Sequence, residues 1–122
     1  MVVAWVAIDD ADDENGCLYV YPGSQHEPIL PVRDLVDPGL GKQSSSFNER
    51  DRESIMPSSY TPRIMRVPAG GVGFMHCHLV HESGTNLSKT RFRRSAVMDY
   101  IRVGAPFRPG NSAQRYRFNL YN

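Results

Sequence analysis

The chain has 122 residues, with 14 basic and 13 acidic side chains and a formal net charge of +1. A chain of this length has room for one hydrophobic core, so we expect a single domain over residues 1–122. The nearly neutral charge excludes a strong overall field for nucleic acid or acidic lipid, and no apolar run of about 18 residues exists to cross a membrane.

The first residues, MVVAWVAIDD, lack the basic start and the small-residue cleavage site of a signal peptide. The two cysteines, Cys17 and Cys77, are therefore expected to be free thiols in a reducing compartment. Together these features predict a cytoplasmic protein.

Two apolar segments open the chain. Residues 2–8 form a continuous run rich in β-branched side chains, which predicts a strand covered on both faces. Residues 9–16 are acidic and end in Asn-Gly, and residues 17–21 predict a second strand, so we expect a hairpin with a long polar connection. The acidic run lacks the spacing and the glycine placement of a calcium loop, which favours a solvated turn.

Residues 25–61 are rich in Pro, Ser, Asp and Arg and show no clean periodicity. A loop of this length inside a compact domain predicts a functional lid or a disordered connection. Further strands are expected over residues 63–67, 72–80, 93–103 and 115–121, separated by Gly- and Pro-containing turns. Short strands punctuated in this way predict an all-β barrel or jelly roll.

Residues 74–86, FMHCHLVHESGTN, contain three of the four histidines. If residues 72–80 form one strand, His76 and His78 share a face because side chains alternate, and His81 lies at the rim where the strand ends. Imidazole is a ligand for iron, zinc, copper and nickel. The alternative is that these histidines only form hydrogen bonds at a half-buried face, and the pattern leaves both interpretations open.

The segment RFRRSAV contains a second candidate group. In a strand that begins near Arg91, Arg93 and Ser95 point the same way and Arg94 points to the opposite side. An arginine fork with a nearby hydroxyl suits bidentate binding of a carboxylate, whereas the alternative is a charged strand edge that resists aggregation. An antiparallel hairpin would bring Arg93 close to His81, at the same end of the barrel. The strand pattern also turns at least one arginine of KTRFRR inward, which argues against a nucleic-acid surface.

Two longer motifs resemble those of one known family. The segment AWVAIDDADDENGCLYVYPGSQ (residues 4–25) resembles the part of the phytanoyl-CoA dioxygenase family in which a Trp-bearing strand leads into DD, ENG-L and PGS. The segment VPAGGVGFMHCHLVHESGTNLSKTRFRRSAVMDY (residues 67–100) is similar to the second signature of that family, in which AGD, FH, LH-S, N, RR and Y follow in order. The two motifs occur in the family's order, and their combination is far more specific than either alone.

The resemblance implies a cupin-like double-stranded β-helix (a jelly roll) and an oxygenase that uses iron(II) and 2-oxoglutarate to hydroxylate a small organic substrate. Iron in this family is held by two histidines and one carboxylate. By resemblance, His81 matches the distal histidine ligand, Arg93 matches the arginine that binds the far carboxylate of 2-oxoglutarate, and Ser95 lies where a helper hydroxyl occurs. Ser83 and Asn86 match the turn after the distal histidine and are interpreted as supports.

The other two iron ligands of the family form a His-x-Asp pair, and the sequence contains no His-x-Asp or His-x-Glu. We therefore expect the C-terminal part of a dioxygenase domain, an incomplete jelly roll whose parent protein is an enzyme with a small-molecule substrate. Two other hypotheses stay open. His76, His78 and His81 could form a cupin-like metal site without 2-oxoglutarate, or the chain could be a non-catalytic jelly-roll fragment that pairs with another chain as a homo-oligomer.

Overall fold

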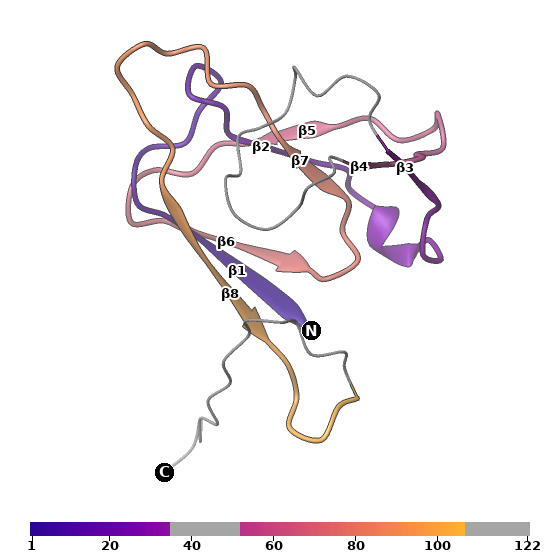
Figure 1. The fold of residues 1–122 in the computed structure, drawn as a ribbon. Coiled ribbons are helices and arrows are strands. Elements are labelled where there is room, and N and C mark those ends of the chain that lie inside the picture. The colour runs from indigo at the N-terminus through magenta and orange to yellow at the C-terminus, as the bar shows by residue number, and fades with distance from the viewer. Residues whose placement is uncertain (35–51, 107–122) are drawn as a thin grey trace.

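The computed structural model describes residues 1–34 and 52–106, which contain eight strands and one short 3₁₀ helix (Figure 1). In chain order these elements are β1 (Val2–Ala7), β2 (Leu18–Val20), η1 (Ser24–His26), β3 (Val32–Asp34), β4 (Arg52–Ser54), β5 (Arg63–Met65), β6 (Val72–His76), β7 (His81–Ser83) and β8 (Ser95–Tyr100). The expected strand over residues 115–121 and the middle of the expected loop, residues 35–51, lie outside the described residues. In the described part, no helix has the length and apolar character needed to cross a membrane.

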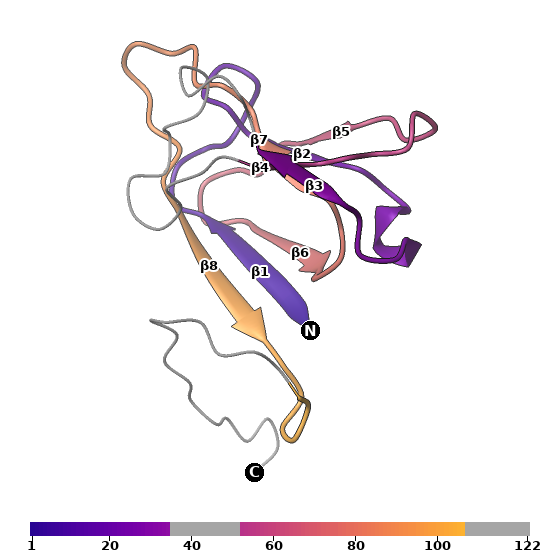
Figure 2. The same cartoon turned by 45° about the vertical axis from the view of Figure 1, so that its right-hand side comes forward.

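The strands form two three-stranded antiparallel sheets, in the orders β6-β1-β8 and β5-β2-β7, and one two-stranded sheet, β3-β4. From β5 onward the chain changes sheet at every strand, so that β5 and β7 lie in one sheet and β6 and β8 in the other. Figures 1 and 2 show these two sheets as separate layers. The all-β prediction is confirmed, and the antiparallel arrangement is the one expected of a jelly roll.

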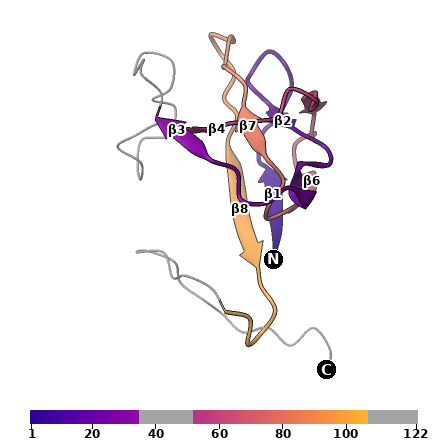
Figure 3. The same cartoon turned by 90° about the vertical axis from the view of Figure 1, so that its right-hand side faces the viewer.

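The hydrophobic core lies between the two three-stranded sheets. Trp5 from β1, Leu18 from β2 and Met75 from β6 are buried and belong to one cluster, against which Val20 and Met65 pack. The β3-β4 pair lies at the same end of the molecule as β2 and β7, away from the far end of β8 (Figure 3). The facing surfaces of the two sheets therefore form the inside of the molecule.

The predicted hairpin between the first two strands is wrong. β1 pairs with β6 and β8, whereas β2 pairs with β5 and β7, so the two strands belong to different sheets. The connection leaves β1 and pairs locally at Ala11, whose N–H donates to the carbonyl of Val67 at 2.8 Å and whose carbonyl accepts from Val67 at 3.0 Å. This bridge turns the chain from one sheet to the other.

The predicted strand over residues 72–80 is too long. β6 ends at His76, and a turn follows in which the N–H of Leu79 donates to the carbonyl of His76 at 2.9 Å. The chain then enters the other sheet as β7. The expected strand at residues 93–103 is shorter too, because β8 covers only Ser95–Tyr100. Residues 25–61 contain the end of η1 and strands β3 and β4, and their role as a lid stays a prediction.

Candidate functional site

His81 lies on the inner face of β7. In the register of this sheet, His81 is opposite Val20 and Ser83 is opposite Leu18, so both polar side chains share the face of two core residues. The Nδ1 atom of His81 lies 3.0 Å from the carbonyl oxygen of Leu79. Because a carbonyl oxygen only accepts, Nδ1 carries the proton and donates it, which leaves Nε2 as a lone-pair donor for a ligand. A bond of this kind is how proteins orient metal-binding histidines.

Arg93 approaches the same face from the segment that precedes β8. Its Nη2 donates to the hydroxyl of Ser83 at 3.1 Å, and its Cζ lies 5.8 Å from the ring centroid of Trp5. The side chain is half-buried, and this burial lowers the pKa of its guanidinium. Within residues 1–34 and 52–106, no carboxylate forms an ion pair with Arg93.

The neighbouring arginines are paired with the acidic loop, which we define as residues 9–16. Arg94 donates from Nη2 and Nε to the carboxylate of Asp9 at 2.7 and 2.9 Å, and these bonds lower the pKa of Asp9 to about 2. Arg91 donates to Asp12 at 2.6 Å and to Glu14 at 2.9 Å, and its bond lowers the pKa of Asp12. The expected turn is therefore held by ion pairs, while Asp13 and Glu14 stay exposed to solvent.

Asn15 joins the acidic loop to the residues around Arg93. The sequence did not predict this contact. The side chain of Asn15 is 1% exposed. Its Nδ2 donates to the carbonyls of Asp10 at 2.6 Å and Phe92 at 3.0 Å, and its Oδ1 accepts from the N–H of Asp12 at 2.9 Å. The only signal in the sequence was the Asn-Gly pair, which indicated a turn and not a contact with a segment far along the chain.

The other candidate residues around Arg93 are also located. Ser95 is the first residue of β8, and its register with Ala7 puts it on the inner face of that sheet. Asn86 donates from Nδ2 to the carbonyl of Arg91 at 2.8 Å, so it holds the backbone of the arginine segment, which we define as residues 91–94. Ser83 holds the guanidinium of Arg93 itself. The parts of Ser83, Ser95 and Asn86 in ligand binding remain predictions.

His76 and His78 do not join His81. They do not share a strand face, because β6 ends at His76, and their rings meet edge to face with centroids 5.4 Å apart. The N–H of His78 donates to Nδ1 of His76 at 3.2 Å, which occupies that lone pair. Within residues 1–34 and 52–106, no group of three or more His, Cys, Asp or Glu side chains could hold a metal ion. The described residues therefore do not fit a three-ligand iron site, and the role of His81 as an iron ligand stays a prediction from the resemblance.

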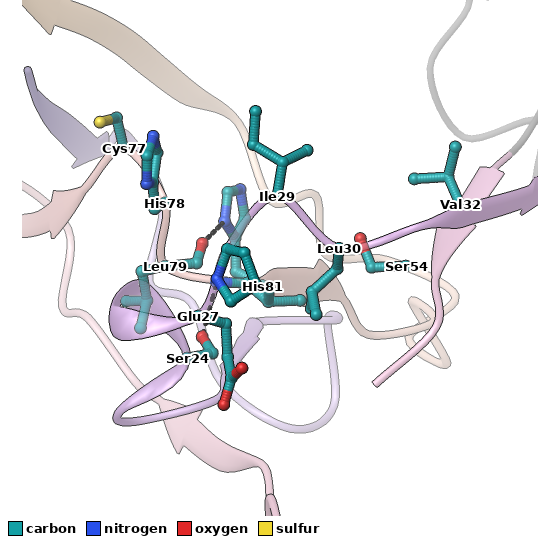
Figure 4. A pocket seen from close by; sticks show the side chains of 12 residues that line it. Ser24, Glu27, Ile29, Leu30, Val32, Ser54, Cys77, His78, Leu79 and His81 are labelled. Atoms are coloured by element: carbon teal, nitrogen blue, oxygen red, sulfur yellow. Dashed lines mark hydrogen bonds between the residues drawn. The ribbon is translucent and has the colours of Figure 1, made fainter. Parts of the chain in front are cut away.

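A cavity of about 340 Å³ lies beside His81. Residues 27–30 line one part of it and residues 77–81 line another, and most of these side chains are apolar (Figure 4). Ser24, a buried residue that the sequence argument did not single out, accepts a hydrogen bond from the N–H of Val80 at 2.9 Å and so fixes the approach to β7.

Comparison with known proteins gives a family match. The model of the phytanoyl-CoA dioxygenase family matches residues 1–95, a range that contains Trp5, the acidic loop, His81 and Arg93.

Individual relatives agree with this match. The rat peroxisomal phytanoyl-CoA dioxygenase is 32% identical over 103 residues, which cover 82% of this chain and 28% of the rat protein. The L-proline trans-4-hydroxylase of Streptomyces griseoviridis is 32% identical over 108 residues, or 80% of this chain and 39% of that protein. Mouse phytanoyl-CoA dioxygenase domain-containing protein 1 is 31% identical over 110 residues, or 90% and 36% of the two chains. The chain thus spans well under half the length of these relatives.

Proposed function

The chain belongs to the phytanoyl-CoA dioxygenase family, and on this basis we propose that it forms the part of an iron(II)- and 2-oxoglutarate-dependent oxygenase that binds 2-oxoglutarate. The whole protein would hydroxylate a small organic substrate. This proposal agrees with relatives that are named as dioxygenases and as a proline hydroxylase.

The observation that carries the proposal is the state of Arg93. Its guanidinium is half-buried against Trp5, and no described carboxylate forms an ion pair with it. Taking a cation out of water is unfavourable unless an anion or strong acceptors compensate, and Ser83 provides one acceptor. A carboxylate of a ligand satisfies the guanidinium by two parallel N–H···O bonds.

The position of His81 supports a ligand with a second functional end. Ser83, which bonds Arg93, and His81 are two residues apart on one face of β7, about 7 Å along the strand. A dicarboxylate such as 2-oxoglutarate can therefore bind Arg93 with one end and extend along the inner face of β7 toward His81.

Iron(II) dependence is proposed from the family membership of the chain, and not from the geometry of the described residues. His81 would provide one ligand, and a three-ligand set would be completed from outside the described residues. The apolar cavity beside His81 is the proposed place for the substrate, because apolar walls bind the hydrocarbon part of a small molecule.

The test is a calorimetric titration of the chain with 2-oxoglutarate. We expect Arg93→Ala to weaken binding by about tenfold or more, because a hydrogen-bonded charge pair in a half-buried site is lost. Arg93→Lys should bind with intermediate affinity, because an ammonium cannot form the bidentate contact.

The matched control is Arg66→Ala. Arg66 is exposed and pairs with Asp13 at 2.5 Å, and it takes no part in the contacts of Arg93 with Trp5 and Ser83, so this variant should bind like the wild type. Equal affinities for the wild type and for Arg93→Ala would overturn the proposal.

A further inference from the structure

We propose that the acidic loop is a positioning device for Arg93, in which Asp9 and Asp12 occupy Arg94 and Arg91 so that Arg93 alone meets the anionic ligand. The inference rests on the proposed function, because it concerns how the same carboxylate site is built. Asp9 and Asp12 are positioning residues, since they act through the arginine segment and do not touch the ligand.

The arginines next to Arg93 are potential competitors for an anionic ligand. Three arginines lie within residues 91–94, and any of them could attract a dicarboxylate. Arg94 holds both carboxylate oxygens of Asp9, and Arg91 holds Asp12 and Glu14. These pairs neutralise the two flanking cations, whereas no described carboxylate is paired with Arg93.

Hydrogen bonds also fix the backbone on either side of Arg93. The residue before it, Phe92, has its carbonyl bonded by Nδ2 of Asn15 at 3.0 Å. The residue after it, Arg94, has its N–H bonded by Oδ2 of Asp9 at 2.8 Å, and its carbonyl accepts from the N–H of Ile8 at 3.0 Å. The chain around Arg93 is therefore fixed by the acidic loop and the end of β1, although no strand begins before Ser95.

The acidic loop is also connected to the residue that contacts the guanidinium of Arg93. Trp5, which stacks on Arg93, lies in β1, and the acidic loop follows β1 directly. One continuous segment thus provides the platform for the guanidinium and the bonds that fix its backbone. Trp5 is also the single tryptophan of the chain, so its fluorescence reports on this site without interference from another indole.

The experiment is a titration of the chain with 2-oxoglutarate, followed by the fluorescence of Trp5. We expect Asp9→Asn and Asp12→Asn each to weaken binding by about fivefold or more, at the lower end of typical coupling between linked sites. The matched control is Asp13→Asn, because Asp13 lies in the same loop but pairs with Arg66 and not with the arginine segment. This control should bind like the wild type.

A charge exchange separates positioning from a general loss of structure. The double variant Asp9→Arg with Arg94→Asp restores an ion pair of opposite sense but removes the acceptor for the backbone N–H of residue 94, so it should recover part of the affinity lost in Asp9→Asn. Thermal midpoints of the same samples verify that each protein is folded at the titration temperature. Failure of the exchange to recover affinity would count against positioning.

The two proposals fail in different ways. If the wild type binds and Arg93→Ala does not, but Asp9→Asn and Asp12→Asn bind like the wild type, the positioning role is overturned and the carboxylate site stands. If the wild type shows no fluorescence or calorimetric response to 2-oxoglutarate, both are overturned.

Discussion

At the scale of single residues, two adjacent arginines have opposite surroundings. Arg94 is exposed and paired with Asp9, whereas Arg93 is half-buried between Trp5 and Ser83. The sequence predicted these opposite orientations from strand alternation, although the structure produces them in a segment that precedes the strand. The ion partners could not be predicted, because Asp9 and Arg94 are 85 residues apart in the chain.

The Asp9–Arg94 pair makes stability depend on pH. The pKa of Asp9 is lowered from 3.8 to about 2, first by the side-chain hydrogen bond from Arg94 and then by its backbone N–H. Because the carboxylate form is favoured in the folded state, its contribution is fully present above pH 3.8 and is lost as the pH falls toward 2.

We therefore expect the thermal unfolding midpoint of the wild type to fall as the pH drops through this range, and to fall less steeply in Asp9→Asn. Melts over a series of acidic buffers measure both slopes. An unchanged slope in the variant would show that the pair does not couple to folding.

At the scale of elements, the acidic loop and the β7–β8 connection touch through two glycines. Gly16 has φ +81°, and a Cβ on it would lie 2.5 Å from the carbonyl oxygen of Gly84. The N–H of Gly84 in turn donates to the carbonyl of Cys17 at 2.9 Å. This close approach holds the acidic loop against the start of the β7–β8 connection, directly after Ser83.

The contact gives a prediction with an internal control. Gly70→Ala carries the cost of a positive φ alone, about 1 kcal/mol, because nothing lies within 4 Å of its Cβ position. Gly16→Ala adds a backbone clash, so we expect it to cost roughly 1–3 kcal/mol more in the free energy of unfolding. Denaturant titrations of both variants measure the difference, and equal losses would mean that the loops separate without cost.

The sequence predicted most strands but not their partners. The apolar runs at β1, β2, β5, β6 and β8 and the glycine turns between them carry a local signal. Sheet membership does not, because β2 and β5 pair across 40 residues and more. The turn after His76 was missed for a different reason, because the apolar pattern of residues 72–80 continues through it.

At the scale of the whole molecule, one sheet has an apolar outer face. Val2, Val72, Phe74, Met98 and Tyr100 lie on the side of β6-β1-β8 that faces away from the core, and each is at least 42% exposed. Exposed apolar faces of this kind are covered by other chain segments or by a partner. The chain covers only 28% to 39% of the relatives described above.

We therefore expect the 122-residue chain to self-associate as its concentration rises, and Phe74→Glu to reduce this association. Phe92→Glu is the matched control, because Phe92 is 74% exposed, similar to the 71% of Phe74, but lies in a loop and not on the sheet. Sedimentation velocity over a concentration series measures both. Equal association of the two variants would exclude the outer face as the contact.

The most direct test of the carboxylate site is an NMR titration of the ¹⁵N-labelled chain with 2-oxoglutarate, following the side-chain Nε–H signals of Arg91, Arg93 and Arg94 together. Because Arg91 and Arg94 are already paired with the acidic loop, we expect the signal of Arg93 to shift with added ligand while the other two stay nearly fixed. Shifts at Arg91 or Arg94 without one at Arg93, or no shift at any of the three, would contradict the site described above.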